Sequence, residues 1–376
     1  MPSAKKPLRV LHLTSRLDGY GGASMLRALA ASQAAAGERV VVAPLSLQKA
    51  PVNALRDQGV VVQTLGSRWP IDVIAIARLS RLRRQLQADV THAWDMRTLA
   101  HAAMSGRRRP GHVLIGSLLA IGDATRWTER VLRSIHTRVT AFTVPEEAAR
   151  ERLAQLGVAP QRIHVIAPGV SRRCGIGIRA SRQALLTELG LSDDAKLIAV
   201  AGPLRRDRQI DEAIWAYELV RVVHPEVRLL VVGDGPDRPR LERFAEQVSE
   251  PGAVRFLGYR DDWVSLLPGV DVYWQLNPSV TTPLALLEAA AAGTVTVASD
   301  VPAHRAAVTH ERTGLLVKLG DRAEAVRATD ELLSNPPRGI RLGQAAAERI
   351  AERWSLDATL AAFDRLYERL LQASSA

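Results

Sequence analysis

The sequence lacks most features of secreted, zinc-binding and membrane-spanning proteins. Cys174 is the only cysteine among 376 residues, so no intrachain disulfide can form and a reducing setting is expected. No Cys/His cluster has zinc-ligand spacing, and no stretch approaches the roughly 18 apolar residues that span a bilayer. The apolar run at residues 10–14 is too short for a signal-peptide core. We therefore expect no metal cofactor and a cytoplasmic protein, either soluble or peripheral at the inner face of a membrane.

Positive charge is concentrated in the first half of the chain. Residues 1–170 contain 24 Lys and Arg against 11 Asp and Glu, whereas residues 171–376 contain 26 against 28. A solvated arginine-rich surface would explain this asymmetry, but so would attraction to an anionic membrane surface or a lipid-linked acceptor. A nucleic-acid partner is not expected, because no helix-turn-helix, zinc-finger or RNA-binding aromatic motif is present. The main basic clusters are Arg78, Arg81, Arg83 and Arg84, and then Arg107, Arg108 and Arg109.

Short β-branched apolar runs alternate with longer amphipathic stretches, and this pattern occurs twice. A Gly- and Arg-rich segment near residues 169–181 separates the two halves and is interpreted as a linker. The alternation predicts two α/β domains, each a doubly wound parallel sheet covered by helices. Such sheets bind ligands beyond the carboxyl ends of their strands, and two of them facing each other would form a central cleft. We place a Rossmann-like domain at residues 1–170, a second at 171–355, and a C-terminal helix at 356–376.

A glycine-rich turn, Gly19 to Ser24, follows the first expected strand. Its glycines would let the backbone approach a ligand, and the following helix would offer unpaired N–H groups to a phosphate. A tight turn without a ligand is the alternative interpretation. The dinucleotide fingerprint fails because Ser24 occupies its last glycine position and no acidic residue ends the second strand. A Rossmann oxidoreductase is thereby disfavoured.

Two further loops follow expected strands in the second half. Arg205, Arg206 and Arg208 share one loop, whose guanidinium groups suit a diphosphate; a solvated basic loop is the alternative. The second loop, 233–236, is a good turn by composition and a plausible cleft wall. Glu288 is the only charge on the apolar helix expected at 284–292, so a ligand hydroxyl or a protein group must satisfy it.

These four segments, in this order, resemble the retaining glycosyltransferases of family 4, which have the GT-B fold. The resemblance runs along nearly the whole chain and includes residues 166–170, 254–258, 295–299 and 313–317. It implies a hexosyltransferase-like enzyme of carbohydrate biosynthesis. Such an enzyme moves a sugar from a nucleotide-diphosphate sugar to an acceptor, here lipid-linked or polysaccharide. The donor would bind the second domain, and the acceptor would bind the first.

The resemblance also implies particular roles. Gly21 and Gly22 match a diphosphate loop, Tyr259 and Arg260 fall near the nucleobase, and Glu288 would hold the ribose hydroxyls. The usual Arg and Lys of the second diphosphate loop fall at Pro203 and Arg208, so that Arg205 and Arg206 are the candidate replacements for the missing charge. We expect Arg208 and Arg205 to be the catalytic groups, because this transfer depends on stabilising the diphosphate.

The sequence departs from the family pattern at three places. The first of two expected glutamates falls at Val280, which cannot accept a hydrogen bond from a sugar hydroxyl. The usual Gly-Phe-Gly is replaced by Thr281, Thr282 and Pro283, and the proline has no N–H to offer. The histidine expected near residues 116–118 is absent, and His92 is the substitute candidate.

Two functions therefore stay open: an active, divergent transferase, and a catalytically degenerate binding or scaffold protein. The predicted donor-binding residues are Gly21, Gly22, Arg206, Gly233, Asp234, Tyr259, Arg260, Thr281, Thr282 and Glu288, and the acceptor-side candidates are His92, Arg81 and Arg84.

Overall fold

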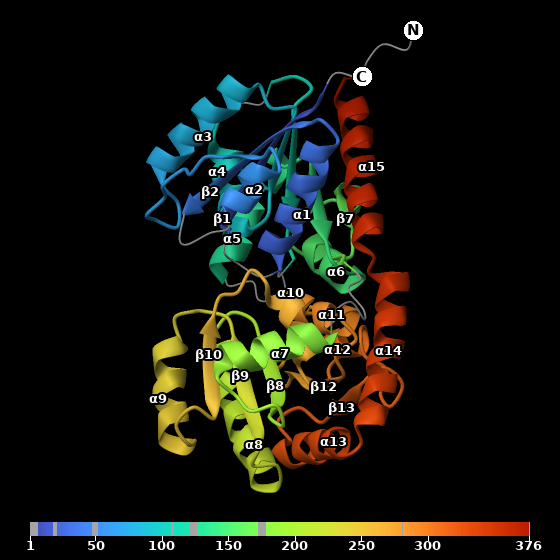
Figure 1. Ribbon diagram of the computed structural model, residues 1–376. Helices are drawn as coiled ribbons and strands as arrows, with labels where there is room; N and C mark the ends of the chain where they lie inside the picture. The colour runs from blue at the N-terminus through green and yellow to red at the C-terminus, as the bar shows by residue number, and fades with distance from the viewer. Residues whose placement is uncertain are drawn as a thin grey trace. The chain divides into compact units, whose positions relative to one another are not determined.

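The computed structural model describes residues 7–17, 21–46, 52–106, 109–119, 126–171, 178–279 and 281–375. Cys174, Gly19, Arg107, Arg108 and Val280 lie outside the described residues. The chain divides into two compact units, unit 1 (residues 1–169 and 356–376) and unit 2 (residues 170–355). Each unit is built on one parallel sheet with helices on both sides (Figure 1), which confirms the predicted pair of Rossmann-like α/β domains.

In the described part of unit 1, seven parallel strands pair in the order β3-β2-β1-β4-β5-β6-β7. The strands are β1 (Arg9–Arg16), β2 (Arg39–Ser46), β3 (Val61–Val62), β4 (Val90–Ala93), β5 (Val113–Ser117), β6 (Ala141–Val144) and β7 (Ile163–Val165). The helices are α1 (Gly22–Ala35), α2 (Val52–Asp57), α3 (Val73–Leu86), α4 (Met96–Met104), α5 (Arg126–Ile135), α6 (Glu147–Gln155) and α15 (Leu356–Ser375).

The core of unit 1 lies on both faces of this sheet. Alternate residues of a strand point to opposite faces, so Val10 enters one hydrophobic cluster while Leu11 and Leu13 enter the other. Helix α15 covers the Val10 face with Phe363 and Tyr367, both buried. The apolar runs of the sequence thus belong to strands that are buried on both sides, as expected for a parallel sheet.

In the described part of unit 2, six parallel strands pair in the order β10-β9-β8-β11-β12-β13. The strands are β8 (Lys196–Ala201), β9 (Val227–Val232), β10 (Val254–Gly258), β11 (Val272–Gln275), β12 (Thr296–Ser299) and β13 (Leu315–Val317). The helices are α7 (Ile178–Leu189), α8 (Ile210–Val223), α9 (Arg238–Val248), α10 (Trp263–Leu266), α11 (Leu284–Ala291), α12 (Pro302–Arg305), α13 (Arg322–Ser334) and α14 (Pro336–Arg353).

The structure differs from the sequence interpretation mainly in its helices. Helix α7 begins inside the segment interpreted as a linker, and Arg182 on this helix donates to Gly269 O, Ala195 O and the carboxylate of Asp271. These contacts are distant in sequence, so local pattern could not reveal them. Helix α4 is also absent from the sequence interpretation; it is only nine residues long, and six of them are buried.

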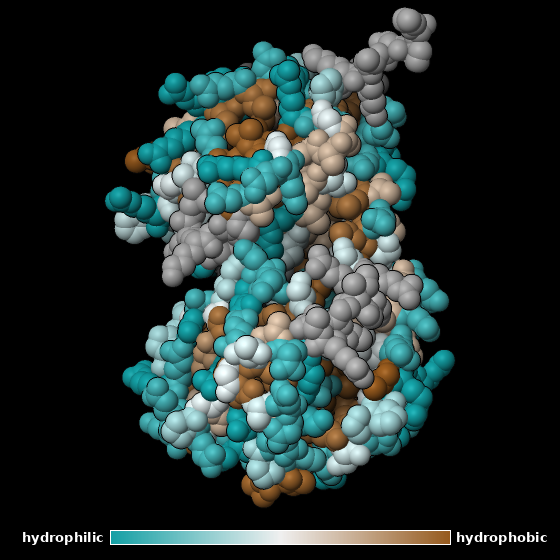
Figure 2. Space-filling view, in the orientation of Figure 1, coloured by the Kyte–Doolittle hydropathy of each residue, from teal (hydrophilic) through white to brown (hydrophobic). Residues whose placement is uncertain are grey.

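The surface of unit 2 carries an apolar stripe on α8. Trp215, Leu219 and Val222 are 41, 46 and 80 % exposed and recur at helical spacing. Figure 2 shows a hydrophobic patch at the end of unit 2 where Figure 1 places α8. Among the described residues, no helix is long and apolar enough to cross a membrane.

Candidate functional site

The strand order of unit 2 places a topological switch point between β8 and β11. Strand β8 pairs with β9 on one side and β11 on the other, so the chain leaves these two strands in opposite directions. Ligands of doubly wound sheets bind at such a point, beyond the carboxyl ends of the strands. The loops that emerge here follow β8 and β11, and they contain Arg206, Thr281 and Thr282 of the predicted donor-binding residues together with the expected catalytic Arg205 and Arg208.

The three arginines of the first loop differ in their surroundings. Arg205 donates twice to Asp207, and its Nη2 lies 2.6 Å from Oδ2. Arg206 is 84 % exposed and only its Nε approaches a carboxylate, at 3.9 Å from Asp237. Arg208 is 24 % exposed and lies 3.6 Å from Asp207. The Arg205 hydrogen bond is the main reason that the pKa of Asp207 is lowered. Part of the loop's positive charge is therefore already balanced within the loop, and Arg208 is its least exposed arginine.

Gly233 and Gly235 hold the neighbouring loop against this one. A Cβ on Gly233 would lie 1.9 Å from Gly202 O, and one on Gly235 would lie 2.3 Å from Leu204 O. The amide of Leu204 donates to Asp234 O at 3.1 Å, while the Asp234 carboxylate accepts from the Gly235 amide. The predicted donor-binding residues Gly233 and Asp234 thus support the arginine loop through backbone packing.

Glu288 has a protein partner. Its side chain is buried on α11, and Oε2 accepts a hydrogen bond from the indole Nε1 of Trp263 at 3.2 Å. A carboxylate can accept about four hydrogen bonds. Thr282 donates to Ala303 O at 3.0 Å, which joins the loop after β11 to α12, and Thr281 precedes it half-buried. Pro283 stands at the N-cap position of α11.

His304 on α12 is a residue that the sequence interpretation missed. Its Nδ1 donates to Ser299 O at 2.8 Å, so Nε2 is the acceptor nitrogen of the neutral ring. Burial lowers the pKa of His304 to about 4, and the nearby positive charge of Arg208 acts in the same direction. Among the described residues Nε2 is buried and has no hydrogen-bond partner. A histidine just beyond a buried strand, at the ligand-binding edge, is the signal that could have identified it.

Tyr259 and Arg260 form a polar turn between β10 and α10. The Tyr259 hydroxyl donates to Asp261, and Arg260 donates to Asp262 and to Glu188 of α7. The hydrogen bond with Asp262 is the main cause of the raised pKa of Arg260. The charge of Arg260 is therefore balanced by two carboxylates of its own domain.

Unit 1 has a matching switch point between β1 and β4. Gly21, with φ of 70°, occupies the N-cap of α1, where no side chain caps the helix. Gly22 begins the helix, and a Cβ there would lie 3.4 Å from Trp94 O. The first turn of α1 thus presents its N–H groups at the carboxyl-end edge of the sheet, the arrangement that suits an anion.

His92 is not available to an acceptor, contrary to the sequence expectation. It is fully buried in β4; Nδ1 lies 2.7 Å from the Tyr367 hydroxyl and Nε2 lies 2.6 Å from Ser117 Oγ. Its ring stacks on Trp94 with centroids 4.4 Å apart. Both ring nitrogens are hydrogen-bonded inside unit 1, because α15 covers the sheet face that carries His92.

The arginines of α3 do not all lie on one side of the helix. Arg81 and Arg84 are exposed on the outer side of the helix, and Arg84 donates to Ser80 Oγ. Arg83 lies on the opposite side, where it donates to Ser105 Oγ. Arg83 is therefore apart from the exposed Arg78, Arg81 and Arg84, because adjacent helical positions are about 100° apart.

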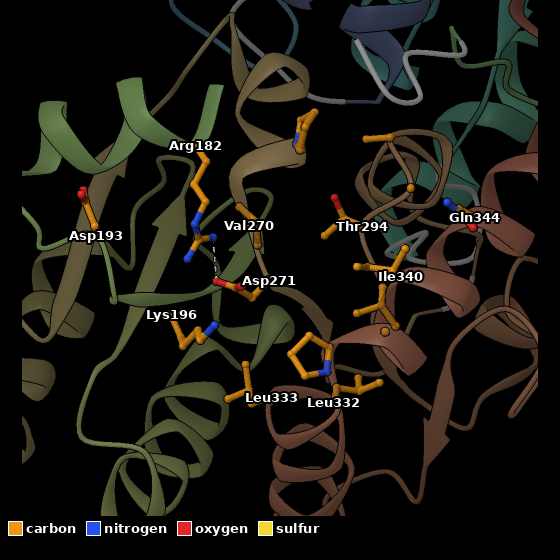
Figure 3. Close-up of a pocket in the computed structure, with 16 residues that line it drawn as sticks. Arg182, Asp193, Lys196, Val270, Asp271, Thr294, Leu332, Leu333, Ile340 and Gln344 are labelled. Carbon is orange, nitrogen blue, oxygen red and sulfur yellow. Dashed lines mark hydrogen bonds and ion pairs between the residues drawn. The ribbon is translucent and has the colours of Figure 1, made fainter. Parts of the chain in front are cut away.

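A cavity of about 500 Å³ opens at the other edge of the unit 2 sheet, beside the amino ends of β8 and β11. Figure 3 shows Arg182 and Asp271 paired on one side of it, with Lys196 close by, and the apolar Leu332, Leu333 and Ile340 also in the lining. None of the predicted site residues lines it. The cavity is therefore separate from the switch-point loops.

Two family models match the chain. The model described as Glycosyltransferase Family 4 matches residues 20–173, and the model described as Glycosyl transferases group 1 matches residues 181–349. Together they span both units.

Curated relatives are also glycosyltransferases. The D-inositol 3-phosphate glycosyltransferase of Stackebrandtia nassauensis is 31 % identical over 208 residues, which covers 52 % of this chain and 46 % of that protein. The lipopolysaccharide core biosynthesis glycosyltransferase LpsD of Rhizobium meliloti is 24 % identical over 345 residues, 85 % of this chain and 92 % of that protein. The chain thus spans about half the length of the first of these relatives and nearly all of the second.

Solved structures share the fold. HepE from Anabaena, crystallised with UDP and glucose, superposes with a TM-score of 0.81 at 16 % identity, covering 96 % of this chain and 99 % of that one. Sucrose-phosphate synthase from Thermosynechococcus elongatus superposes with a TM-score of 0.77 at 18 % identity, covering 97 % and 100 %. With both family models and these neighbours in agreement, the chain belongs to the GT-B glycosyltransferases of family 4.

Proposed function

We propose that the protein transfers a sugar, with retention, from a uridine- or guanosine-type nucleotide-diphosphate sugar bound to unit 2. The observation that carries the proposal is the position of Arg208. It lies on the loop that leaves β8 at the switch point of unit 2, in the electrostatic range of the neutral His304 of α12. The structural neighbour HepE was crystallised with UDP and with UDP-glucose, which supports a uridine donor.

In this proposal the arginine loop supplies the charge that the leaving diphosphate needs. Arg208 would contact the diphosphate directly. Arg205 would also bind it once a phosphate oxygen displaces the Asp207 carboxylate from the Arg205 guanidinium. Fixed donors that meet developing negative charge lower the barrier because they need little reorganisation. No metal cofactor is required, so added EDTA should leave turnover unchanged.

The acceptor would bind unit 1. The excess of basic residues lies there, and it suits a lipid-linked acceptor or attachment to an anionic membrane surface. An uncharged polysaccharide is the alternative acceptor.

A thermal-shift panel tests the donor site. UDP, GDP, UDP-glucose and GDP-mannose are compared with the nucleosides alone, because a ligand that binds only the native state raises the melting temperature. A shift with one diphosphate, followed by donor hydrolysis or transfer, supports the proposal. If no nucleotide at millimolar concentration shifts the melting temperature, the proposed donor site is refuted.

A degenerate binding or scaffold protein is the second candidate. It is favoured by the chemistry of the segment before α11, where the side chain of Val280 has no hydrogen-bonding group and Pro283 has no N–H. This function predicts saturable binding of a nucleotide diphosphate without hydrolysis or transfer on prolonged incubation with candidate acceptors.

A further inference from the structure

A cavity of about 430 Å³ lies at the amino-end edge of the unit 1 sheet. It is bounded by the end of α3, the segment before β4, the turn after α4 and the segment before β5. Gly21 and Gly22 begin α1 at the opposite, carboxyl-end edge of the same sheet. The cavity is therefore separate from the edge at which this type of sheet binds its substrate.

The lining of this cavity is basic. It includes Arg83, Arg84 and Arg109, together with Ser80, Ser105 and His112, and no acidic residue is among the lining residues that the structure describes. The nearby Asp89 pairs with Arg109 at 3.0 Å, and it is already shared with Arg9. One carboxylate thus serves two arginines, and the cavity keeps an excess of positive charge.

Arg83 and Arg84 donate hydrogen bonds to serine hydroxyls of this lining. Arg83 donates to Ser105 Oγ at 2.5 Å, and its Nη2 lies 3.5 Å from His112 Nδ1. His112 is in turn fixed by Thr91 Oγ1, 2.9 Å from Nε2. Arg84 donates to Ser80 Oγ at 2.9 Å. Arginines at the end of a helix also favour the helix dipole, but Arg109 comes from a different segment and has no such role.

The outer face of helix α3 extends along the helix to this cavity, and Arg84 belongs to both. The outer face includes Val73, Ile74, Arg78, Arg81 and Arg84, all exposed, while Leu79 and Leu82 are buried on the inner face. Val73 and Ile74 are 75 and 60 % exposed. Apolar side chains and arginines on one face suit the boundary between headgroups and acyl chains of an anionic bilayer.

We propose that the cavity binds the phosphate group of an anionic membrane lipid, with the outer face of α3 lying along the bilayer. Arginine guanidinium groups match phosphate oxygens in a two-bond geometry, and the serine hydroxyls add donors. Val73 and Ile74 insert among the upper acyl chains. The inference rests on the membrane attachment proposed above, and it names the contact surface and the lipid class.

Vesicle co-sedimentation of the full chain tests the proposal with a charge-matched pair of variants. Arg84→Gln/Arg109→Gln removes two arginines from the cavity, and Arg39→Gln/Arg56→Gln removes two exposed arginines elsewhere on unit 1. Vesicles are phosphatidylcholine alone or with phosphatidylglycerol or phosphatidic acid. The wild type should bind only anionic vesicles. The cavity variant should bind roughly thirtyfold more weakly, and the control variant should change by about threefold or less.

Inorganic phosphate distinguishes the possible sources of the phosphate group. If phosphate alone stabilises the wild type but not the cavity variant, and no vesicle binds, the ligand is a free phosphate and the membrane assignment is overturned. If the two charge-matched variants lose vesicle affinity equally, binding is due to a dispersed basic surface. That result would also overturn the assignment of the cavity to a lipid phosphate. Val73→Ser/Ile74→Ser should weaken vesicle binding without changing the effect of phosphate.

The UDP-induced melting shift is measured on the same variants. It should persist in Arg84→Gln/Arg109→Gln, because none of the predicted donor-binding residues lines this cavity. If UDP does not raise the melting temperature of the wild type, the donor proposal is contradicted. The vesicle result alone tests whether the cavity binds a lipid phosphate.

Discussion

The imidazole Nδ1 of His92 lies 2.7 Å from the hydroxyl of Tyr367, although 275 residues separate them in sequence. Both side chains are buried, His92 in β4 and Tyr367 in α15. This hydrogen bond joins the last helix of the chain to the middle of the unit 1 sheet. Phe363 lies beside it, its ring centroid 5.5 Å from that of His92. Helix α15 is therefore part of the unit 1 core.

Tyr367→Phe should destabilise unit 1 by about 1–3 kcal/mol, because it leaves a buried ring nitrogen without its hydroxyl partner. Urea unfolding followed by circular dichroism gives the free energy of unfolding. Tyr259→Phe is the matched control, since its hydroxyl bonds to an exposed Asp261 and its loss should cost about 0.5 kcal/mol or less. Equal effects in the two variants would refute the buried bond as a stabilising element.

Stability should fall as the pH is lowered from about 6.5 to about 4. Burial lowers the pKa of His12 and of His304 to about 4, from an ordinary value of 6.5. The unfolded chain binds protons in this window and the folded chain does not, so the free energy of unfolding decreases with falling pH. The loss is about 3 kcal/mol for each histidine at the acid end. Urea titrations across this range measure it.

His304→Asn removes one of these protonation sites and should make the pH dependence shallower. Identical slopes for the wild type and His304→Asn would show that His304 is protonated equally in the folded and unfolded chain.

Gly233→Ala should destabilise unit 2 more than Gly202→Ala does. The two glycines have almost the same φ, 144° and 142°, so both substitutions strain the backbone similarly. Only at Gly233 does the added Cβ meet another atom, Gly202 O at 1.9 Å; at Gly202 nothing lies within 4 Å. We expect about 1 kcal/mol for Gly202→Ala and at least about 3 kcal/mol for Gly233→Ala. Thermal unfolding of the two variants compares them directly.

Arg208→Ala should weaken binding of UDP more than binding of uridine. Loss of one charge-assisted contact to the diphosphate costs roughly 1.5–3 kcal/mol, and uridine makes no such contact. Isothermal titration calorimetry with both ligands measures the difference. Equal weakening would assign Arg208 a purely structural role.

His304→Leu tests whether His304 orients Arg208. The positive charge of Arg208 contributes to the lowered pKa of His304, so His304→Leu and Arg208→Ala should be coupled by about 1 kcal/mol in a double-mutant cycle on UDP binding. Additive effects would mean that the two residues act independently.

Glu288→Gln should reduce UDP binding while changing stability little. Glutamine keeps the shape and can still accept the Trp263 indole proton, but it loses the charged acceptor for ribose hydroxyls. Unfolding and binding are measured on the same preparation. A large loss of stability with unchanged affinity would make Glu288 only a partner of Trp263.

Sequence alone determined the two-domain α/β fold of this protein. Strands such as residues 113–117 and 227–232 are apolar and β-branched because both faces of a parallel sheet are buried, and that requirement acts on every strand separately. Glycines and arginines directly after strands likewise indicated the ligand-binding edge, because the end of a strand is a local property.

Tertiary structure decided what each polar side chain does there. His92 is an interior residue because α15, more than 260 residues later, covers its strand. Gly233 supports another loop because Gly202 O approaches it, and His304 meets the charge of Arg208 across a long separation in sequence. Burial and hydrogen bonding depend on neighbours brought together only by folding, and no periodicity within one segment records them.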